Sequence, residues 1–321
     1  MPPPPDLSSH ILSEAVSKEI FETTILPAEF PPSTTPSPSP LAVLLLGQTG
    51  AGKTRTAPAL HALLAARRGP PIHLIADTYK AFHPSYASLA ATSSPAQASA
   101  AASPDARRWL AMAVVEAVAR RADVLLETAC RHPTDFTSLA EALAAGGYRV
   151  EVVVLAVPEG LSRLGIMARY YQRLPEAGSR GLQARLTPRR IHDDSYVGLL
   201  ASARWLDAGG VDQVLVVRRG NLVVFGSERV GGRMEGSVVE AVSGERRRPL
   251  SEEEARFARE DMRRLEGVEA AVADLEEVKM LLAPLLEGGE GTEDFPPLRP
   301  LLFADPENQT FRADNMLRLG A

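Results

Sequence analysis

Short apolar runs separated by helical patterns occupy the sequence between residues 41 and 226. The runs predict strands at 41–46, 71–76, 124–127 and 149–157, and a strand pair at 211–219 and 221–226. Runs that are apolar throughout are typical of parallel strands buried on both faces. Helical patterns follow them, to about Arg68 and over 104–121, 135–145, 159–174 and 188–205. This alternation predicts an α/β fold with a mainly parallel sheet covered by helices on both faces.

The flanking segments differ from this pattern. Residues 11–26 have apolar positions at helical spacing and predict a short amphipathic helix, and the Pro/Ser/Thr-rich stretch 30–40 predicts an extended linker. Residues 88–102 are rich in Ala and Ser without clear periodicity, which predicts a flexible loop or a poorly specified helix. Residues 251–288 predict one or two solvated helices. We therefore expect an N-terminal helix and linker (1–40), an α/β domain (41–230) and a helical C-terminal extension with an irregular tail from Phe295 (231–321).

Charge and composition limit the kinds of partner that we expect for this protein. The formal net charge is −5, so nothing in bulk indicates a nucleic acid or an anionic membrane as partner. No apolar run reaches the ~18 residues that span a bilayer. The single cysteine, Cys130, allows no internal disulfide, and the proline-rich N-terminus lacks the features of a secretory signal. We expect a cytoplasmic protein with no membrane or nucleic-acid partner.

A glycine-rich turn joins the first strand to the first helix. It matches G-x-x-x-x-G-K-[ST] at every fixed position. Its glycines allow backbone N–H groups to approach phosphate oxygens, and the next helix points its N-terminus at the anion. Lys53 can reach the β- and γ-phosphates, and Thr54 can offer its hydroxyl to Mg²⁺. The turn predicts a P-loop NTPase three-layer sandwich that binds ATP and Mg²⁺ through Gly47, Gln48, Thr49, Gly50, Ala51, Gly52, Lys53 and Thr54. Kinases, GTPases and motor ATPases share this turn, so it leaves the reaction open.

Carboxylates stand at the ends of two other strands. Asp77 follows the second strand, where it could take a proton from an acceptor hydroxyl, help to hold Mg²⁺, or cap a helix. Glu127 ends the third strand, and a carboxylate there is costly unless it is paired or faces a ligand. We expect Cys130 to serve packing, because phosphoryl transfer needs no thiol.

A basic stretch follows the fourth strand. Arginines stabilise the charge that spreads over the equatorial oxygens of a transferring phosphoryl group. Each single arginine could equally lie on a solvated helix face, but a cluster of this size favours a phosphate lid. The stretch contains Arg169, Arg173, Arg180, Arg185, Arg189 and Arg190.

Taken in order, these motifs resemble the zeta-toxin family. The resemblance covers roughly residues 41–226 and rests on GQTGAGKT, ADTYKAFHP (76–84), LLET (125–128), VVLAVP (153–158), MARY (167–170) and ARLTPRRIHD (184–193). The family is similar in fold to small-molecule kinases. Its bacterial toxins phosphorylate UDP-N-acetylglucosamine at the sugar 3′-hydroxyl, and an antitoxin helix occludes their nucleotide site.

The resemblance implies roles for individual residues. It implies that Thr54 binds Mg²⁺ and that Asp77 is the general base toward the acceptor hydroxyl. The catalytic set that it implies is Lys53, Asp77, Arg169 and Arg185, and the acceptor side comprises Glu127, Arg131 and His83.

Two departures from the family pattern fall on the acceptor side. Where the family usually has Glu-Gly-Thr, this chain has Glu127-Thr128-Ala129. The helix before that strand presents Ala111-Met112-Ala113 where an acidic residue is common. We therefore expect an ATP-dependent kinase for a hydroxyl-bearing metabolite, with a UDP-N-acetyl sugar as the acceptor that the resemblance implies. One alternative is a nucleotide-binding interaction module, in which ATP occupancy gates a partner that docks on the helix at 11–26 or on the helices at 251–288. Another is a P-loop kinase for an unrelated acceptor. An antitoxin or an internal inhibitory helix is a further expected partner.

Overall fold

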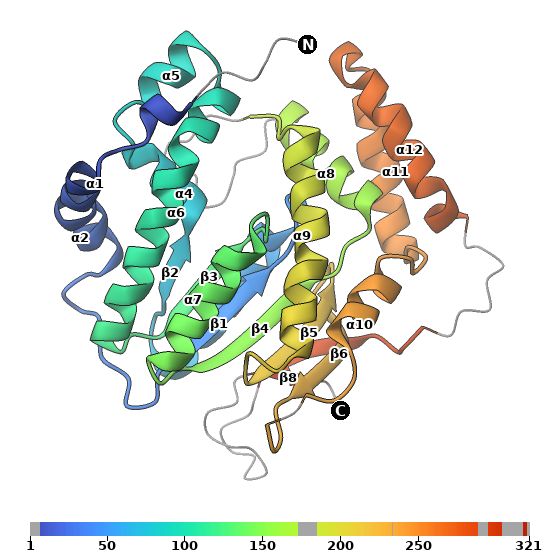
Figure 1. Ribbon diagram of the computed structural model, residues 1–321. Coiled ribbons are helices and arrows are strands. Elements are labelled where there is room, and N and C mark those ends of the chain that lie inside the picture. The colour runs from blue at the N-terminus through green and yellow to red at the C-terminus, as the bar shows by residue number, and fades with distance from the viewer. Residues whose placement is uncertain (1–6, 173–184, 233, 288–294, 304–316, 320–321) are drawn as a thin grey trace.

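A sheet of eight strands runs through the centre of the structure (Figure 1). The computed structural model describes residues 7–172, 185–232, 234–287, 295–303 and 317–319. The strand order is β2-β3-β1-β4-β5-β6-β7-β8; the first five strands in this order run parallel and the last three join antiparallel. The strands are β1 (Leu41–Leu46), β2 (Ile72–Ile75), β3 (Val124–Thr128), β4 (Arg149–Leu155), β5 (Gln213–Arg218), β6 (Leu222–Glu228), β7 (Arg299–Phe303) and β8 (Leu317–Leu319).

Helices cover both faces of this sheet, as the apolar runs predict. Alternate side chains of β1 serve the two cores: Ala42, Leu44 and Leu46 belong to one, and Leu41, Val43 and Leu45 to the other. The first core is closed by α6 (Pro95–Arg120), α7 (Pro133–Ala145), α9 (Arg189–Asp207) and α10 (Val238–Glu245). The second is closed by α3 (Lys53–Arg68), α8 (Glu159–Tyr171), α11 (Glu252–Glu266) and α12 (Val272–Leu286). The predicted α/β class with a mainly parallel sheet is confirmed.

The Ala/Ser-rich stretch is helical. Residues 88–102 fall in α5 (Tyr86–Thr92) and the first turns of α6, so α6 begins nine residues before the predicted start at 104 and Pro104 lies inside it. Ser94 caps α6 by accepting a hydrogen bond from the Gln97 N–H at 3.1 Å. Short side chains let α5 and α6 pack closely, with Ala98 and Ala102 buried against Tyr86. The buried side chains that this part of α6 contributes are small, so they leave no clear apolar period in the sequence, and the pattern left loop and helix open.

The N-terminal segment packs into the first core instead of standing apart from the α/β domain. It consists of α1 (Glu14–Ile20), a π-helical turn (Phe21–Ile25) and α2 (Leu26–Glu29). Ile25 is fully buried, and Phe21 and Phe30 are nearly so. The indole N–H of Trp109 on α6 donates to the Ser17 carbonyl at 2.8 Å. This helix therefore belongs to the folding unit of the sheet.

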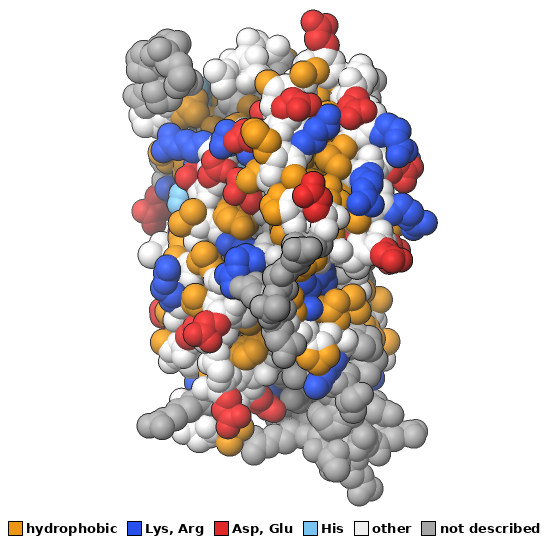
Figure 2. Space-filling view, turned by 90° about the vertical axis from the view of Figure 1, so that its right-hand side faces the viewer, with side chains coloured by type: hydrophobic (Ala, Val, Ile, Leu, Met, Phe, Trp, Pro, Cys, Tyr) orange, Lys and Arg blue, Asp and Glu red, His pale blue; other side chains and the backbone are white. Residues whose placement is uncertain are grey.

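The C-terminal helices are half-buried instead of merely solvated. Ser251 and Glu254 form a capping box at the start of α11, and Leu265 of α11 and Val278 and Leu282 of α12 are buried in the second core. Figure 2 views this side of the molecule, where charged side chains of both signs stand among hydrophobic ones. The tail from Phe295, expected to be irregular, contributes strands β7 and β8. Within the described residues, no helix has both the length and the apolar character needed to cross a membrane.

The burial of the N-terminal helix makes a stability prediction. Ile25→Ala should lower the free energy of unfolding by about 2–5 kcal/mol, because it deletes methyl groups from a closed core. Val16→Ala, at a position 42% exposed on α1, should change it by less than about 0.5 kcal/mol. Urea unfolding followed by circular dichroism measures both. Equal values for the two variants would contradict the placement of this helix in the core.

Candidate functional site

The phosphate turn adopts the backbone that its glycines permit. Gly50 and Gly52 have φ of 81° and 107°, in the left-handed region. A Cβ on Gly50 would lie 2.0 Å from the Ser162 carbonyl oxygen, so only glycine fits between the turn and α8. The Lys53 amine donates to the Gly47 carbonyl at 2.6 Å, and burial lowers the pKa of this amine. The turn thus curls around the N-terminus of α3, with the lysine folded over it.

Hydrogen bonds with three other parts of the chain hold the turn in place. Gln48 is fully buried, and its side-chain N–H donates to the Val157 carbonyl at 2.7 Å. The Thr49 N–H donates to the Ser195 hydroxyl at 3.1 Å. From the β5–β6 turn, Arg219 donates to the Gly50 carbonyl at 2.7 Å. Gln48, predicted among the cofactor-binding residues, therefore serves to fix the turn.

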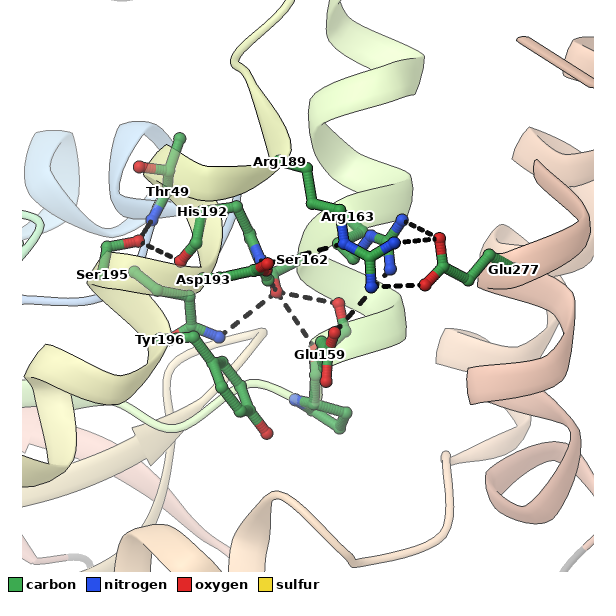
Figure 3. Close-up of polar contacts among 12 residues, drawn as sticks. Thr49, Glu159, Ser162, Arg163, Arg189, His192, Asp193, Ser195, Tyr196 and Glu277 are labelled. Carbon is green, nitrogen blue, oxygen red and sulfur yellow. Dashed lines mark hydrogen bonds and ion pairs between the residues drawn. The ribbon is translucent and has the colours of Figure 1, made fainter. Parts of the chain in front are cut away.

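A polar network extends from the turn to the C-terminal helices (Figure 3). Ser195 also donates to the His192 carbonyl, and the His192 ring shares hydrogen bonds with the Ser162 hydroxyl at 2.8 Å and with Asp193 at 3.0 Å. Burial lowers the pKa of His192, which favours its neutral form. Glu159, His192 and Asp193 bring potential ligand atoms within 4.8 Å of one another, but both ring nitrogens already have partners. The cluster is therefore a connector between α8 and α9.

The far end of this network reaches α12. Glu277 pairs with Arg163 of α8 at 2.8 Å and with Arg189 of α9 at 2.6 Å (Figure 3). These ion pairs lock the C-terminal helices to the two helices that support the phosphate turn.

The turn opens into a large cleft of about 1720 Å³. Its walls include α6 and α7 on one side and the β5–β6 turn and α11 on the other. The cleft brings together most of the residues predicted for the site: Thr49, Gly50, Ala51, Gly52, Lys53, Thr54, Asp77, Glu127, Arg131, Arg169 and Arg185.

Asp77 lies in the short helix α4 (Ala76–Tyr79) with its carboxylate open to the cleft. Ile75 occupies the N-cap position and Asp77 makes no capping hydrogen bond, so it is not the helix cap that the sequence also allowed. The Lys80 amine is 2.5 Å from its carboxylate and Arg185 is 3.3 Å away. These cations hold the pKa of Asp77 well below its usual range, so the group stays ionised.

Glu127 and Arg131 line the cleft at the end of β3 and just after it. Glu127 is nearly buried at the end of β3, and its carboxylate is 2.9 Å from the His73 ring. Arg131 pairs with Asp194 at 3.3 Å. Cys130 between them is buried, and burial raises the pKa of its thiol to about 11, which fits a packing role.

His83 does not line the cleft, although the sequence suggested an acceptor-side role. Its ring is buried, 3.0 Å from the His10 carbonyl and 3.4 Å from Asp105 of α6. The helical turn after Asp77 directs this side chain into the N-terminal segment. His83 therefore ties that segment to α6.

The sequence predicted the β5–β6 strand pair but not the contacts of its turn with the phosphate turn and α3. Gly220 and Asn221 both have positive φ, of 84° and 59°, as a tight hairpin requires. Asn221 accepts a hydrogen bond from the Thr56 hydroxyl of α3 at 2.9 Å, next to the bonds that Arg219 makes. The only signal in the sequence was an Arg-Gly-Asn turn between two strands, which marks a hairpin and no function.

The chain matches the model of a known protein family. A family model described as Zeta toxin matches residues 28–230. The chain belongs to the zeta toxin family. The match ends at β6, so α10, α11 and α12 lie beyond the matched segment.

Solved structures are similar to this zeta toxin family member to different degrees. A structure from work on the PezAT chromosomal toxin–antitoxin system of Streptococcus pneumoniae matches with a TM-score of 0.63 and 18% identity, over 84% of this chain and 98% of the other. A crystal structure of AvrRxo1-ORF1:-ORF2 with ATP matches with a TM-score of 0.46 and 15% identity, over 86% and 88% of the two chains. No curated protein matches the chain.

The hold of Arg219 on the phosphate turn of this zeta toxin family member is testable. Arg219→Met leaves the carbonyls of Gly50 and Leu161 without this donor, and the free energy of unfolding should fall by about 1–3 kcal/mol. Arg55→Met removes a charge from an exposed position at the same end of the cleft and should cost less than about 0.5 kcal/mol. Denaturant unfolding without nucleotide measures both. If Arg55→Met alone lowered the free energy of unfolding, Arg219 would not be the residue that holds the phosphate turn.

Proposed function

We propose that this protein is an ATP- and Mg²⁺-dependent phosphotransferase that moves the γ-phosphate to a hydroxyl group of a small metabolite. The observation that carries the proposal is the position of Asp77, an ionised carboxylate that lines one cleft with the phosphate turn and with Arg169 and Arg185. A module that only binds a nucleotide needs no carboxylate to meet an acceptor hydroxyl. A kinase needs one to accept or orient the acceptor hydroxyl.

The donor side of the cleft suits ATP and Mg²⁺. Backbone N–H groups of the turn and the N-terminus of α3 would hold the phosphates, and Lys53 would exchange the Gly47 carbonyl for phosphate oxygens. The exposed Thr54 hydroxyl, together with phosphate oxygens, would offer the oxygen ligands that Mg²⁺ prefers. The ion would neutralise charge on the β- and γ-phosphates.

The acceptor would react beside Asp77. Its low pKa makes it a weak base, but a loose phosphoryl-transfer transition state asks little of the base beyond orientation of the hydroxyl and a late proton transfer. Arg169 and Arg185 would stabilise the charge on the transferring group.

For the acceptor itself we propose a UDP-N-acetyl sugar. The family resemblance supports this choice, and Arg107 and Arg131 on the acceptor side could meet a diphosphate. The small residues Ala111 and Ala129 line the same region and leave room without offering a polar contact. An antitoxin that blocks the cleft is the protein partner that fits this proposal, since the pneumococcal structure comes from a toxin–antitoxin system.

The acceptor is tested by incubating the protein with ATP, Mg²⁺ and UDP-N-acetylglucosamine and following the sugar nucleotide by mass spectrometry. We expect one added phosphate per sugar nucleotide, with ADP formed in equal amount. ADP formation that depends on an added metabolite extract but not on this sugar nucleotide would keep the kinase and exclude this acceptor.

Asp77→Asn tests the base. Transfer should fall about 10²–10⁴-fold, while ATP affinity should change less than about threefold, because the donor side stays intact. Glu116→Gln, a carboxylate on α6 paired with Arg120 outside the cleft lining, should leave both unchanged. Isothermal titration and a coupled ADP assay give the two quantities. Undiminished transfer by Asp77→Asn would remove Asp77 from the mechanism.

A further inference from the structure

The cleft continues past the phosphate turn on the side opposite the acceptor. β1, which carries the turn, lies between β3 and β4 in the sheet. Asp77 and Glu127 follow β2 and β3 on one side, and the β5–β6 turn stands on the other. A nucleotide whose γ-phosphate faces Asp77 must direct its nucleoside the other way. At about 1720 Å³ the cleft exceeds the roughly 300–1,000 Å³ of a single-ligand pocket.

Helix α11 forms the wall at that far end. One stripe of the helix, Ala255, Ala258, Met262 and Leu265, is buried. A second stripe lines the cleft and comprises Glu253, Phe257, Glu260, Asp261 and Arg264. Figure 1 shows α11 across the molecule from α6, which lines the acceptor end. The two stripes have helical spacing, so packing of the first fixes the direction of the second.

The helix is anchored next to the phosphate turn. Arg218, the last residue of β5, pairs with Glu254 of α11 and with Glu245 of α10. Its neighbour Arg219 donates to the turn carbonyls. Phe257, one turn after Glu254, is therefore held on a rigid support beside the turn, and it is 48% exposed.

The arginines of β5, the β5–β6 turn and α11 that line this end already have partners. Arg218 is paired with Glu254, Arg264 with Glu260, and Arg219 is occupied by backbone carbonyls. The Phe257 ring lines the cleft between them, with Asp261 on the next turn of the helix. The Arg256 guanidinium lies 4.8 Å from the centroid of the Phe257 ring, so a flat ligand has the opposite face of the ring to stack on. The Gln172 side-chain N–H donates to Asp261 at 3.3 Å and orients that carboxylate.

We propose that α11 supplies the nucleoside-binding part of the site: Phe257 stacks on the base and Asp261 accepts a hydrogen bond from a ribose hydroxyl. An uncharged aromatic ring and a polyol are the chemistry that an exposed phenyl ring and an oriented carboxylate recognise. This inference rests on the proposed function, because it takes the ligand of the phosphate turn to be a nucleoside triphosphate. It also assigns a role to a helix outside the segment that defines the family.

Calorimetry with two ligands tests the stacking. ATP carries the nucleoside and inorganic tripolyphosphate lacks it. Phe257→Ala should weaken ATP binding about tenfold, as loss of a base–aromatic stack does, and leave tripolyphosphate binding unchanged. Phe257→Trp should retain ATP affinity. Met280→Ala, which removes a 69% exposed apolar side chain from α12 outside the cleft lining, should have no effect on either ligand.

A second comparison tests the carboxylate. Asp261→Asn should weaken binding of ATP about tenfold and leave binding of 2′,3′-dideoxy-ATP unchanged, because only ATP offers the ribose hydroxyls. Unchanged ATP affinity in Phe257→Ala and Asp261→Asn, with both ligands bound by the wild type, would overturn the α11 subsite and leave the proposed function standing. A wild type that binds neither ATP nor tripolyphosphate would overturn the proposed function and the subsite with it.

Discussion

The phosphate turn does not hold its own shape. Its backbone carbonyls and side chains are fixed from outside, by Arg219 of the β5–β6 turn, by the carbonyl that receives the buried Gln48, and by Ser195 on α9. Gly50 lies so close to the Ser162 carbonyl that no side chain fits between them. A phosphate site made of N–H groups binds well only if those groups already point inward, because reordering them on binding would cost free energy. The rest of the sheet and its helices supply this order.

The chemistry of the cleft varies along its length. One end carries Asp77 among cations, the centre carries the phosphate turn, and the other end carries paired charges with an aromatic ring. Under the proposed function, this division would let one cleft hold a donor and an acceptor in line. Ala111 and Ala129 line the cleft outside the phosphate turn, so changes there would leave the turn itself untouched.

The sequence predicted the features that come from regular apolar patterns or from a complete motif. Runs such as LAVLLL fix strands because only a doubly covered strand is apolar on both faces, and the complete phosphate-turn motif fixed the position of the site. It could not reveal contacts that depend on tertiary packing. Nothing around Ile25 distinguishes a buried helix from a peripheral one, and nothing near Arg219 indicates that its guanidinium reaches the carbonyl of residue 50. The same reason explains why His83 lies outside the cleft lining, since a motif gives a position along the chain and not the direction of a side chain.

The ion pairs of Glu277 with Arg163 and Arg189 bear on how much of the chain the fold requires. The family match has its border after residue 230. However, the apolar side of α8, which includes Leu161, Leu164 and Met167, packs in the same core as α11 and α12. A chain cut at that border would expose this surface to water and leave two arginines without their common carboxylate. The segment that the family model matches is therefore shorter than the segment that the fold requires. Helices α11 and α12 lie outside the matched segment, yet they form part of the second core in the folded protein.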